Sequence, residues 1–458
     1  MSLAISILLA ALASYPPGQV VERIACETDP SQTYALYLPS SYDGGRAWPI
    51  VFLMDPRGRA LVPLELFREA AERHGYILAS SYDTLSDGPP GPNEKAMRAM
   101  LPDVQSRFSI DTRRIHFAGF SGTARVAWIF GYGLKGSAVA GLIGFGGALP
   151  EGLRPAKDPP FAFFGAAGTQ DFNYEEMQAL DGKLDALGIT HRIVDFDGPH
   201  AWPPQPVCAE ALDWMELQAI RSGKRAVDDA LVAALFEERS AEARKLEQEG
   251  DPYGALVRYR AIAEDFTGLR DVAAIAARAD SLDRSKTVKK ERASRSRATA
   301  RQKEFEARLY AFIEESRTAP TPIPLKESLY DLRIEALKRD AGQTEDRITG
   351  DGAKRLLALA LASTAFYEPR DHLANGDPAR ALAVLRVAEA IEPDSPQVCY
   401  NLARALAQLD RKAEAVESLE RAARSGVLDA GTLEADPYLD PVREETRYIA
   451  IIERLKSP

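Results

Sequence analysis

A serine stands between two glycines in the segment Gly119-Phe120-Ser121-Gly122-Thr123, directly after an apolar, strand-like run. Cleavage of an ester carbonyl by a side chain requires a nucleophile, a base and donors that stabilise the oxyanion. A serine on a tight strand-to-helix turn needs small neighbours, because the backbone is strained there and other segments come close. Ser121 is therefore our candidate nucleophile. The motif alone is a weak signal, because Thr123 stands where such turns usually have a second glycine.

A carboxylate and a histidine follow Ser121 in the order that this chemistry needs. Asp171 comes after the apolar run at residues 160–167, and His200 comes after the strand-like run at 192–197. Both lie just past the carboxyl end of an expected strand, where open α/β sheets bind ligands. We expect Ser121 to attack the carbonyl, His200 to transfer the proton, and Asp171 to orient the imidazole and stabilise its charge.

The acid and the base each have an alternative reading. Asp171 could only cap the helix expected near residue 174, and His200 could be an ordinary loop residue. Asp195 and Asp197 are rivals for the acid role, although they lie on the strand beside the histidine.

The oxyanion is expected to be stabilised by two backbone N–H groups. The amide of Gly122 is one, and the other should come from the loop after the third strand, residues 54–59. Because Pro56 has no N–H, Arg57 is the preferred donor and Gly58 the second choice.

Two aromatic residues are the expected pocket side chains. Phe120 adjoins the nucleophile, and Trp202 follows His200 by two residues, where it either walls the pocket or only packs the loop. The stretch at 147–159 is too short to form a lid, so we expect the pocket to be open or to be roofed by the C-terminal half.

The elements that must position these residues alternate along the first half of the chain. Strand-like runs are expected at residues 20–27, 34–39, 49–55, 76–82, 114–120, 139–145, 160–167 and 192–197. Amphipathic helical stretches fall between the later runs. This alternation predicts a doubly wound, largely parallel α/β sheet, whose first strands have a short connection and could pair antiparallel.

The second half of the chain is helical in pattern and contains a repeat. A pattern of small and apolar residues recurs after 34 residues, the period of a tetratricopeptide repeat. Its first copy is Ala381, Leu382, Leu385 and Ala388, and its second is Ala415, Val416, Leu419 and Ala422. An echo at 250–256 does not fit this period, so the array is interrupted or degenerate. Small residues indicate close helix packing, and a protein partner bound by the repeats is the alternative.

Composition argues against several classes of function. The net charge of −10 gives no global attraction to nucleic acid or anionic membranes. The basic stretch at 284–303 has no interleaved aromatics, which favours a solvated helix or linker over a nucleic-acid site. The three cysteines fit no metal-site spacing and the five histidines are scattered, so we expect no metal and no cofactor. We expect His116 in the core or sheet and both His74 and His191 at the surface.

The N-terminus resembles a signal peptide. Residues 3–13 are apolar but too short to span a bilayer, and a basic segment before them is missing. We expect export, to the periplasm or outside the cell, with a short N-terminal helix of a cytoplasmic protein as the alternative. No other stretch predicts a membrane helix. In an exported protein, Cys26 and Cys208 could form a disulfide; two buried thiols are the alternative.

Four segments together resemble α/β-hydrolases of the polyhydroxybutyrate depolymerase and feruloyl-esterase-like group. They are Thr33–Pro39, Gly119-Phe-Ser-Gly122, Gly168-Thr-Gln-Asp-Phe-Asn-Tyr174 and Gly198-Pro-His-Ala-Trp-Pro203. The resemblance covers about residues 20 to 220 and implies a serine esterase with the triad described above. Thr123 and the pair Asp55-Pro56, where such enzymes often have His-Gly, depart from the family pattern, so the resemblance does not define the oxyanion geometry or the substrate.

We therefore expect a leader at 1–19, an α/β-hydrolase domain at 20–222, a helical region with a basic linker helix at 223–317, and an all-α domain resembling tetratricopeptide repeats at 318–458. The expected function is hydrolysis of a small or polymeric carboxylic ester through an acyl-enzyme. The alternative is a non-catalytic, hydrolase-like scaffold that binds a protein partner through its repeats. A serine peptidase is a weaker alternative, since it would use the same triad.

Overall fold

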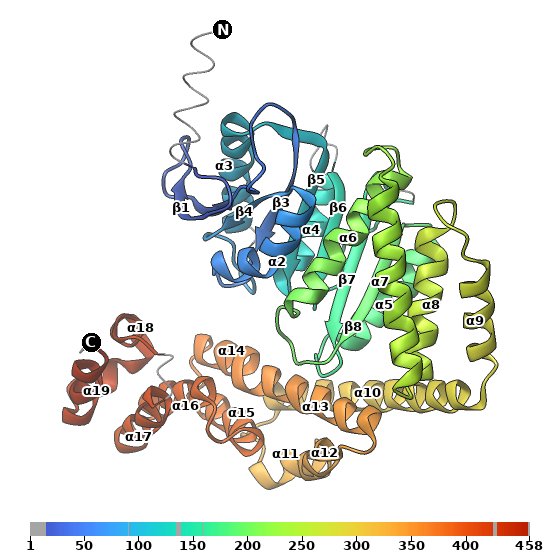
Figure 1. Ribbon diagram of the computed structural model, residues 1–458. Coiled ribbons are helices and arrows are strands. Elements are labelled where there is room, and N and C mark those ends of the chain that lie inside the picture. The colour runs from blue at the N-terminus through green and yellow to red at the C-terminus, as the bar shows by residue number, and fades with distance from the viewer. Residues whose placement is uncertain (1–14, 90, 134–138, 158, 425–427, 457–458) are drawn as a thin grey trace. The chain divides into compact units, whose positions relative to one another are not determined.

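The computed structural model describes residues 15–89, 91–133, 139–157, 159–424 and 428–456 (Figure 1). The chain divides into two compact units, residues 1–292 and 293–458. The apolar stretch on which the predicted leader depends, residues 3–13, lies outside the described residues.

The first unit is built on one eight-stranded sheet with the order β1-β2-β4-β3-β5-β6-β7-β8. The strands are β1 (Val20–Ala25), β2 (Thr33–Tyr37), β3 (Trp48–Met54), β4 (Ile77–Ser81), β5 (Ile110–Phe120), β6 (Val139–Phe145), β7 (Ala162–Gly168) and β8 (His191–Phe196). β2 pairs antiparallel with β1 and β4, and every other pairing is parallel. The predicted doubly wound, mostly parallel sheet is thus confirmed, including its antiparallel start.

Helices cover both faces of this sheet (Figure 1). They are α2 (Leu61–His74), α3 (Gly91–Arg107), α4 (Gly122–Gly133), α5 (Tyr174–Leu187) and α6 (Gln205–Arg221). One core contains side chains of α3, α4 and α5, and a second core on the other face contains side chains of α2 and α6. The central strands β3, β6 and β7 are buried along their whole length, which explains why their sequences are apolar throughout instead of alternating.

The two cysteines of the first unit belong to different cores. Cys26 lies in the core with α3 to α5, and Cys208 lies in the core with α2 and α6. Both thiols are free and buried. Because the sheet stands between them, the disulfide that the sequence left open does not form.

Three further helices pack within the first unit, α7 (Asp229–Gln248), α8 (Pro252–Phe266) and α9 (Ala273–Asp283). Their apolar side chains share a core with Leu217 and Ile220 of α6. The buried Asp265 of α8 accepts hydrogen bonds from Trp214 Nε1 of α6 at 2.9 Å and from Arg192 of β8 at 2.8 Å. These helices are therefore joined to the sheet by apolar packing and by buried ionic hydrogen bonds.

The second unit is helical. The 33-residue helix α10 (Lys286–Thr318) crosses the boundary between the units, and its basic first half pairs with carboxylates, as in Arg301–Asp340 at 2.6 Å. It is followed by α11 (Leu325–Asp331), α12 (Ile334–Ala341), α13 (Arg347–Ala362), the π-helix η1 (Ser363–Tyr367), α14 (Glu368–Ala374), α15 (Pro378–Ile391), α16 (Pro396–Gln408), α17 (Lys412–Ala423), α18 (Ala430–Ala435), the 3-10 helix η2 (Pro437–Val442) and α19 (Thr446–Lys456).

The predicted repeat residues lie at equivalent places in α15 and α17. Ala381 and Ala388 of α15, and Ala415 and Ala422 of α17, are all fully buried. Helix α16 packs against both α15 and α17 through residues such as Leu402 and Leu406. The small residues therefore serve helix packing, as the sequence indicated.

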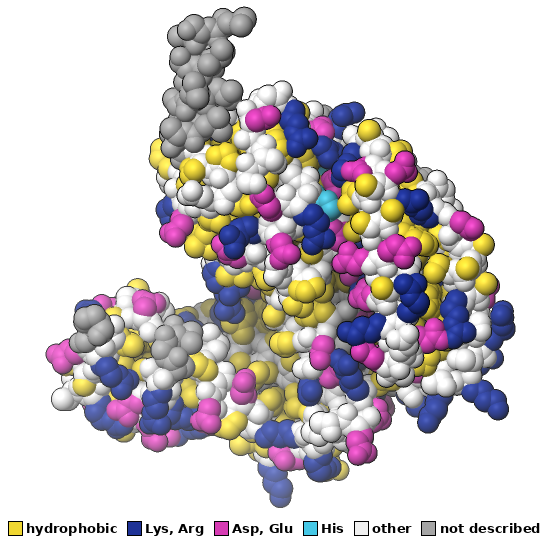
Figure 2. Space-filling view, viewed as in Figure 1, with side chains coloured by type: hydrophobic (Ala, Val, Ile, Leu, Met, Phe, Trp, Pro, Cys, Tyr) yellow, Lys and Arg dark blue, Asp and Glu magenta, His cyan; other side chains and the backbone are white. Residues whose placement is uncertain are grey.

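The surface carries charges of both signs. On the face shown in Figure 2, Lys and Arg side chains are interspersed with Asp and Glu, with hydrophobic side chains between them. Within the described part of the chain, no helix combines the length and the apolar character needed to cross a membrane.

Candidate active site

Ser121 stands at the turn between β5 and α4. Its φ angle is 55°, a left-handed conformation that non-glycine residues adopt rarely and that holds the residue up at the end of the strand. A Cβ atom at Gly119 would overlap the backbone of Thr123, and one at Gly122 would overlap the side chain of Ser86. Both glycines are therefore required, because other segments of the chain approach them too closely for a side chain to fit.

Thr123, which replaces the second glycine of the usual motif, has a structural role in this turn. Its side chain is fully buried, and its hydroxyl oxygen accepts the N–H of Phe120 at 3.1 Å. The carbonyl oxygens of Met54 and Phe120 lie 2.6 Å and 2.8 Å from this hydroxyl, which donates to one of them. The carbonyl oxygen of Met54, which ends β3, is the nearer acceptor, so the threonine links the turn to the neighbouring strand by a bond that a glycine could not make.

Ser121, His200 and Asp171 form a continuous hydrogen-bonded row. Ser121 Oγ lies 2.9 Å from His200 Nε2, and His200 Nδ1 lies 2.8 Å from Asp171 Oδ1. In the neutral tautomer that fits these neighbours, Nδ1–H donates to the carboxylate and Nε2 accepts from the hydroxyl. Asp171 is fully buried, whereas the side chain of His200 is 17% exposed.

Asp171 also makes the capping contact that the sequence left as its alternative role. Its Oδ1 atom accepts the backbone N–H of Asn173 at 2.7 Å, just before α5 begins. The rival carboxylates have other partners: Asp195 accepts from Tyr174 and Gln178, and Asp197 accepts from Gln170.

Two aromatic rings enclose the imidazole of His200. The ring of Phe120 lies 4.6 Å from it and the ring of Phe172 lies 4.1 Å from it, measured between centroids. Trp202 packs on Phe120 at 5.7 Å. Sequence reasoning selected Phe120 and Trp202 but missed Phe172, although its position directly after the candidate acid was a usable signal.

The loop after β3 differs from the expectation for the oxyanion donors. The N–H of Arg57 donates to Asp55 Oδ1 at 2.8 Å, and the N–H of Gly58 donates to the carbonyl oxygen of Asp55 at 3.2 Å. Both predicted donors are thus turned inward, because the buried Asp55 accepts them. Gly122 fits its predicted role better, since it opens α4 and the first N–H groups of a helix have no intrahelical acceptor.

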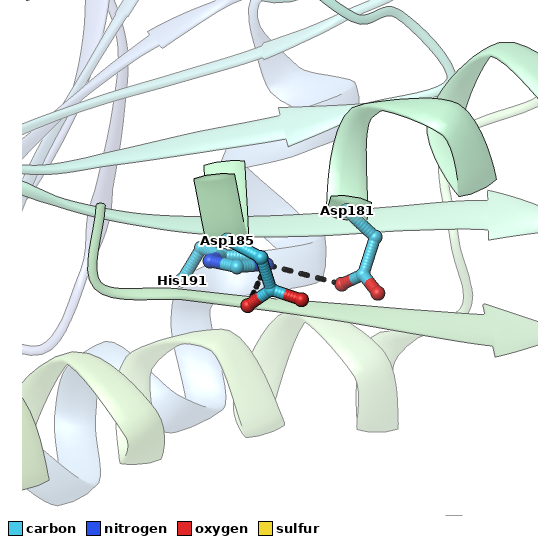
Figure 3. A group of neighbouring side chains, drawn as sticks. All are labelled: Asp181, Asp185 and His191. Carbon is cyan, nitrogen blue, oxygen red and sulfur yellow. Dashed lines mark hydrogen bonds and ion pairs between the residues drawn. The ribbon is translucent and has the colours of Figure 1, made fainter. Parts of the chain in front are cut away.

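A separate group of side chains lies at the N-terminal end of β8, away from the end that leads to His200 (Figure 3). Among the described residues, Asp181, Asp185 and His191 form the one group whose ligand atoms are close enough to hold a metal ion. His191 Nε2 lies 3.1 Å from Asp181 and 4.0 Å from Asp185, while Nδ1 lies 2.7 Å from the carbonyl oxygen of Ile189.

The contacts of His191 are those of a protonated, ion-paired imidazole. Burial alone would lower the pKa of His191, but its hydrogen bonds to Asp181 and Ile189 raise it above the ordinary value. The side chain is only 8% exposed, so the expectation of a surface residue was wrong. The side chain of His74, also expected at the surface, is buried and paired with Asp213, whereas His116 lies in the core as expected.

Known proteins resemble separate parts of the chain. A family model of the tetratricopeptide repeat matches residues 372–430. No curated protein matches the chain. Similar solved structures include FphF, a fluorophosphonate-binding serine hydrolase of Staphylococcus aureus, with 12% identity and a TM-score of 0.37 over 44% of this chain and 99% of that chain.

Two other similar structures are esterases. One is a ferulic acid esterase with 15% identity and a TM-score of 0.34 over 42% of this chain and 94% of that chain. The other is the esterase Est2 of the planctomycete Thermogutta terrifontis, with 13% identity and a TM-score of 0.36 over 46% of this chain and 94% of that chain. Scores this low carry no argument about activity, so function must be argued from the site itself.

The strand order and the serine turn define the class of the protein. A mostly parallel sheet with an antiparallel second strand, followed by helices that include tetratricopeptide-like repeats, is an α/β-hydrolase fold joined to a helical repeat region. The resemblance that the sequence suggested is confirmed at the level of fold.

Proposed function

We propose that this protein is a serine hydrolase that cleaves carboxylic esters, with Ser121, His200 and Asp171 as its catalytic residues. The observation that carries the proposal is the hydrogen-bonded row from Ser121 Oγ through both nitrogens of His200 to the buried Asp171. All three residues follow the carboxyl ends of strands, where open α/β sheets bind their ligands.

The geometry supports a two-step reaction. Ser121 Oγ attacks the ester carbonyl while its proton passes to His200 Nε2, and the negative charge of Asp171 stabilises the resulting imidazolium. His200 then gives the proton to the leaving alcohol as the tetrahedral intermediate collapses to an acyl-enzyme. Water attacks this acyl group with His200 again as the base, which releases the acid and restores the Ser121 hydroxyl.

Hydrolysis of short-chain p-nitrophenyl esters tests this proposal. The wild type should turn over, and Ser121→Ala should lose most of that rate, whereas Ser222→Ala, a change at the end of α6, should not. A fluorophosphonate probe should label Ser121, as peptide mass spectrometry would show. Background rates over several acyl lengths, together with absence of labelling, would refute it. Turnover of matched amides would instead favour the serine peptidase.

One observation favours a second function, a hydrolase-like scaffold that binds a protein partner. The inward turn of the Arg57 N–H leaves the loop after β3 without the backbone donor that we expected. The match to tetratricopeptide repeats gives this reading a separate binding region. It predicts a folded protein without esterase activity whose residues 318–458 retain a partner. Under either function, export belongs to the proposal, and sequencing of the mature N-terminus tests it.

A further inference from the structure

Asp55, at the end of β3, is a buried carboxylate surrounded by donors. Its side chain is inaccessible to solvent. Oδ1 accepts the N–H groups of Arg57 at 2.8 Å and Arg59 at 3.1 Å and also Arg59 Nε at 3.0 Å. Oδ2 accepts Arg59 Nη2 and Trp202 Nε1, at 2.9 Å and 2.8 Å. Burial raises the pKa of Asp55, but the hydrogen bonds from Arg59, Trp202 and Arg57 lower it below its usual value.

The donor Trp202 belongs to a loop that follows a strand distant from β3 in the sheet. Asp55 follows β3, whereas Trp202 belongs to the loop after β8, and β5, β6 and β7 stand between these strands. The indole reaches Asp55 across the carboxyl ends of β5 and β6, where it packs on Phe120 at 5.7 Å and on Phe145 at 5.8 Å. The Asp55–Trp202 bond thus connects two loops that the sheet itself does not join.

Trp202 is connected to the candidate base, His200, through their shared loop and through the Phe120 ring. Trp202 is two residues after His200 in the same loop, and the Phe120 ring packs against both, 5.7 Å from the indole and 4.6 Å from the imidazole. A displaced indole would therefore release one wall of the imidazole and loosen the loop that carries it. Small displacements of reacting groups have large effects on rate, about 10²-fold for about 1 Å.

We propose that Asp55 and Trp202 are positioning residues that hold His200 against Ser121. The Asp55 carboxylate fixes the indole by its Nε1–H, the indole fixes Phe120 and the His200 loop, and these keep Nε2 within hydrogen-bond distance of the nucleophile. The inference rests on the proposed function for its effect on turnover, but the placement of the imidazole can be measured without any turnover.

The chain offers a matched pair of tryptophans for the test. Trp202→Phe removes the Nε1–H and keeps an aromatic ring on Phe120. Trp214→Phe removes the same kind of bond, from Nε1 to the buried, arginine-paired Asp265 at 2.9 Å, within the same unit. This avoids substitution of Asp55 itself, which would leave Arg59 and two backbone N–H groups without their acceptor and could prevent folding.

Kinetics give the first readout. Both variants should lose similar amounts of thermal stability, but only Trp202→Phe should lower kcat, by about 10- to 100-fold, with KM changed less than about twofold. Equal stability losses with kcat preserved in both variants would show that the Asp55–Trp202 bond is only structural and would overturn the inference.

Histidine NMR gives the second readout, which needs no activity. The Cε1–H signal of His200, assigned by its absence in His200→Gln, should be displaced by the ring currents of Phe120 and Phe172. In Trp202→Phe it should move toward the value of a free imidazole, and in Trp214→Phe it should stay. An unchanged signal in both variants contradicts the inference. A wild type with neither turnover nor fluorophosphonate labelling refutes the proposed function alone, and the NMR comparison still decides the positioning role.

Discussion

The turn at Ser121 and the repeat helices α15 to α17 both rest on buried side chains, but different interactions dominate in the two regions. At the turn, buried polar atoms such as the Thr123 hydroxyl and the Asp171 carboxylate are fixed by short, directional hydrogen bonds. In the repeat helices, Ala381, Leu402 and Ala415 belong to one apolar core, and ion pairs such as Arg421–Glu389 lie at its margin. Hydrogen bonds set positions to fractions of an ångström, whereas packing energy scales with buried volume. We therefore expect single-atom changes to alter chemistry in the first region and volume changes to alter stability in the second.

The largest expected effect is on activity at the turn. Asp171→Asn should lower kcat on the order of 10³- to 10⁴-fold, because the imidazolium loses its counter-charge and the amide NH2 can donate to Nδ1, which holds His200 in the wrong tautomer. Steady-state kinetics on a p-nitrophenyl ester measure this loss. Asp195→Asn, at the rival carboxylate bound to Tyr174 and Gln178, should keep kcat within a few-fold. The opposite result would transfer the acid role to Asp195.

In the repeat helices, Leu402→Ala should act on stability instead. The side chain is fully buried, so its truncation should destabilise the second unit by about 2–5 kcal/mol. Urea denaturation measures this effect, and ester hydrolysis of the folded variant should stay unchanged. Glu417→Ala, on the exposed side of α17, is the control with no expected effect on either property. Loss of turnover in folded Leu402→Ala would contradict the expectation that volume changes in the repeat helices alter stability alone.

The pH dependence of stability gives a third test, on the sheet that carries the site. Burial lowers the pKa of His116 from 6.5 to about 4. A depressed pKa contributes stability that is present above pH 6.5 and is lost as the pH falls through about 4, up to roughly 3 kcal/mol. His116→Phe should flatten this part of the urea-denaturation profile relative to the wild type.

The ion-paired His191 is the control for that measurement. Because its pKa is raised, its contribution is present below pH 6.5 and is lost at higher pH, so His191→Gln should change the profile on the alkaline side. A His116 variant whose acid limb matches the wild type would show that His116 does not govern it.

The smallest expected effect comes from Thr123→Val, which removes one hydroxyl and keeps the shape. It leaves the N–H of Phe120 and the carbonyl oxygen of Met54 without this partner, which should cost about 1–3 kcal/mol. Thr123→Ser keeps the hydroxyl and should retain most of the free energy of unfolding measured by urea denaturation. If the Thr123→Val variant were as stable as the wild type, directional hydrogen bonds would not distinguish the turn from the repeat helices.

Local pattern was sufficient to predict much of this fold. Fully apolar runs such as residues 49–54 and 161–164 predicted central strands because both faces of β3 and β7 are covered. β5 is the instructive exception, since it begins at Ile110 instead of near residue 114. Its first residue, Ile110, pairs with Trp48 of β3, and partners distant in sequence cannot be seen in a local window.

The candidate site was predictable only where residue order carries the information. Ser121, Asp171 and His200 follow the carboxyl ends of β5, β7 and β8, so a parallel sheet brings them to one edge. The capture of the Arg57 N–H by Asp55 was not predictable, because a buried side chain decides it. The Asp55–Trp202 bond joins residues 147 apart in sequence, and no pattern along the chain indicates it.

The three free cysteines also allow unfolding to be timed without any introduced label. Cys26 and Cys208 lie in the cores on opposite faces of the sheet, and Cys399 is buried in α16 of the second unit. Burial raises the pKa of all three thiols, that of Cys26 to about 12, so alkylating reagents must wait for each core to open. A pulse of iodoacetamide followed by peptide mass spectrometry would therefore show in what order the two sheet faces and the repeat helices open.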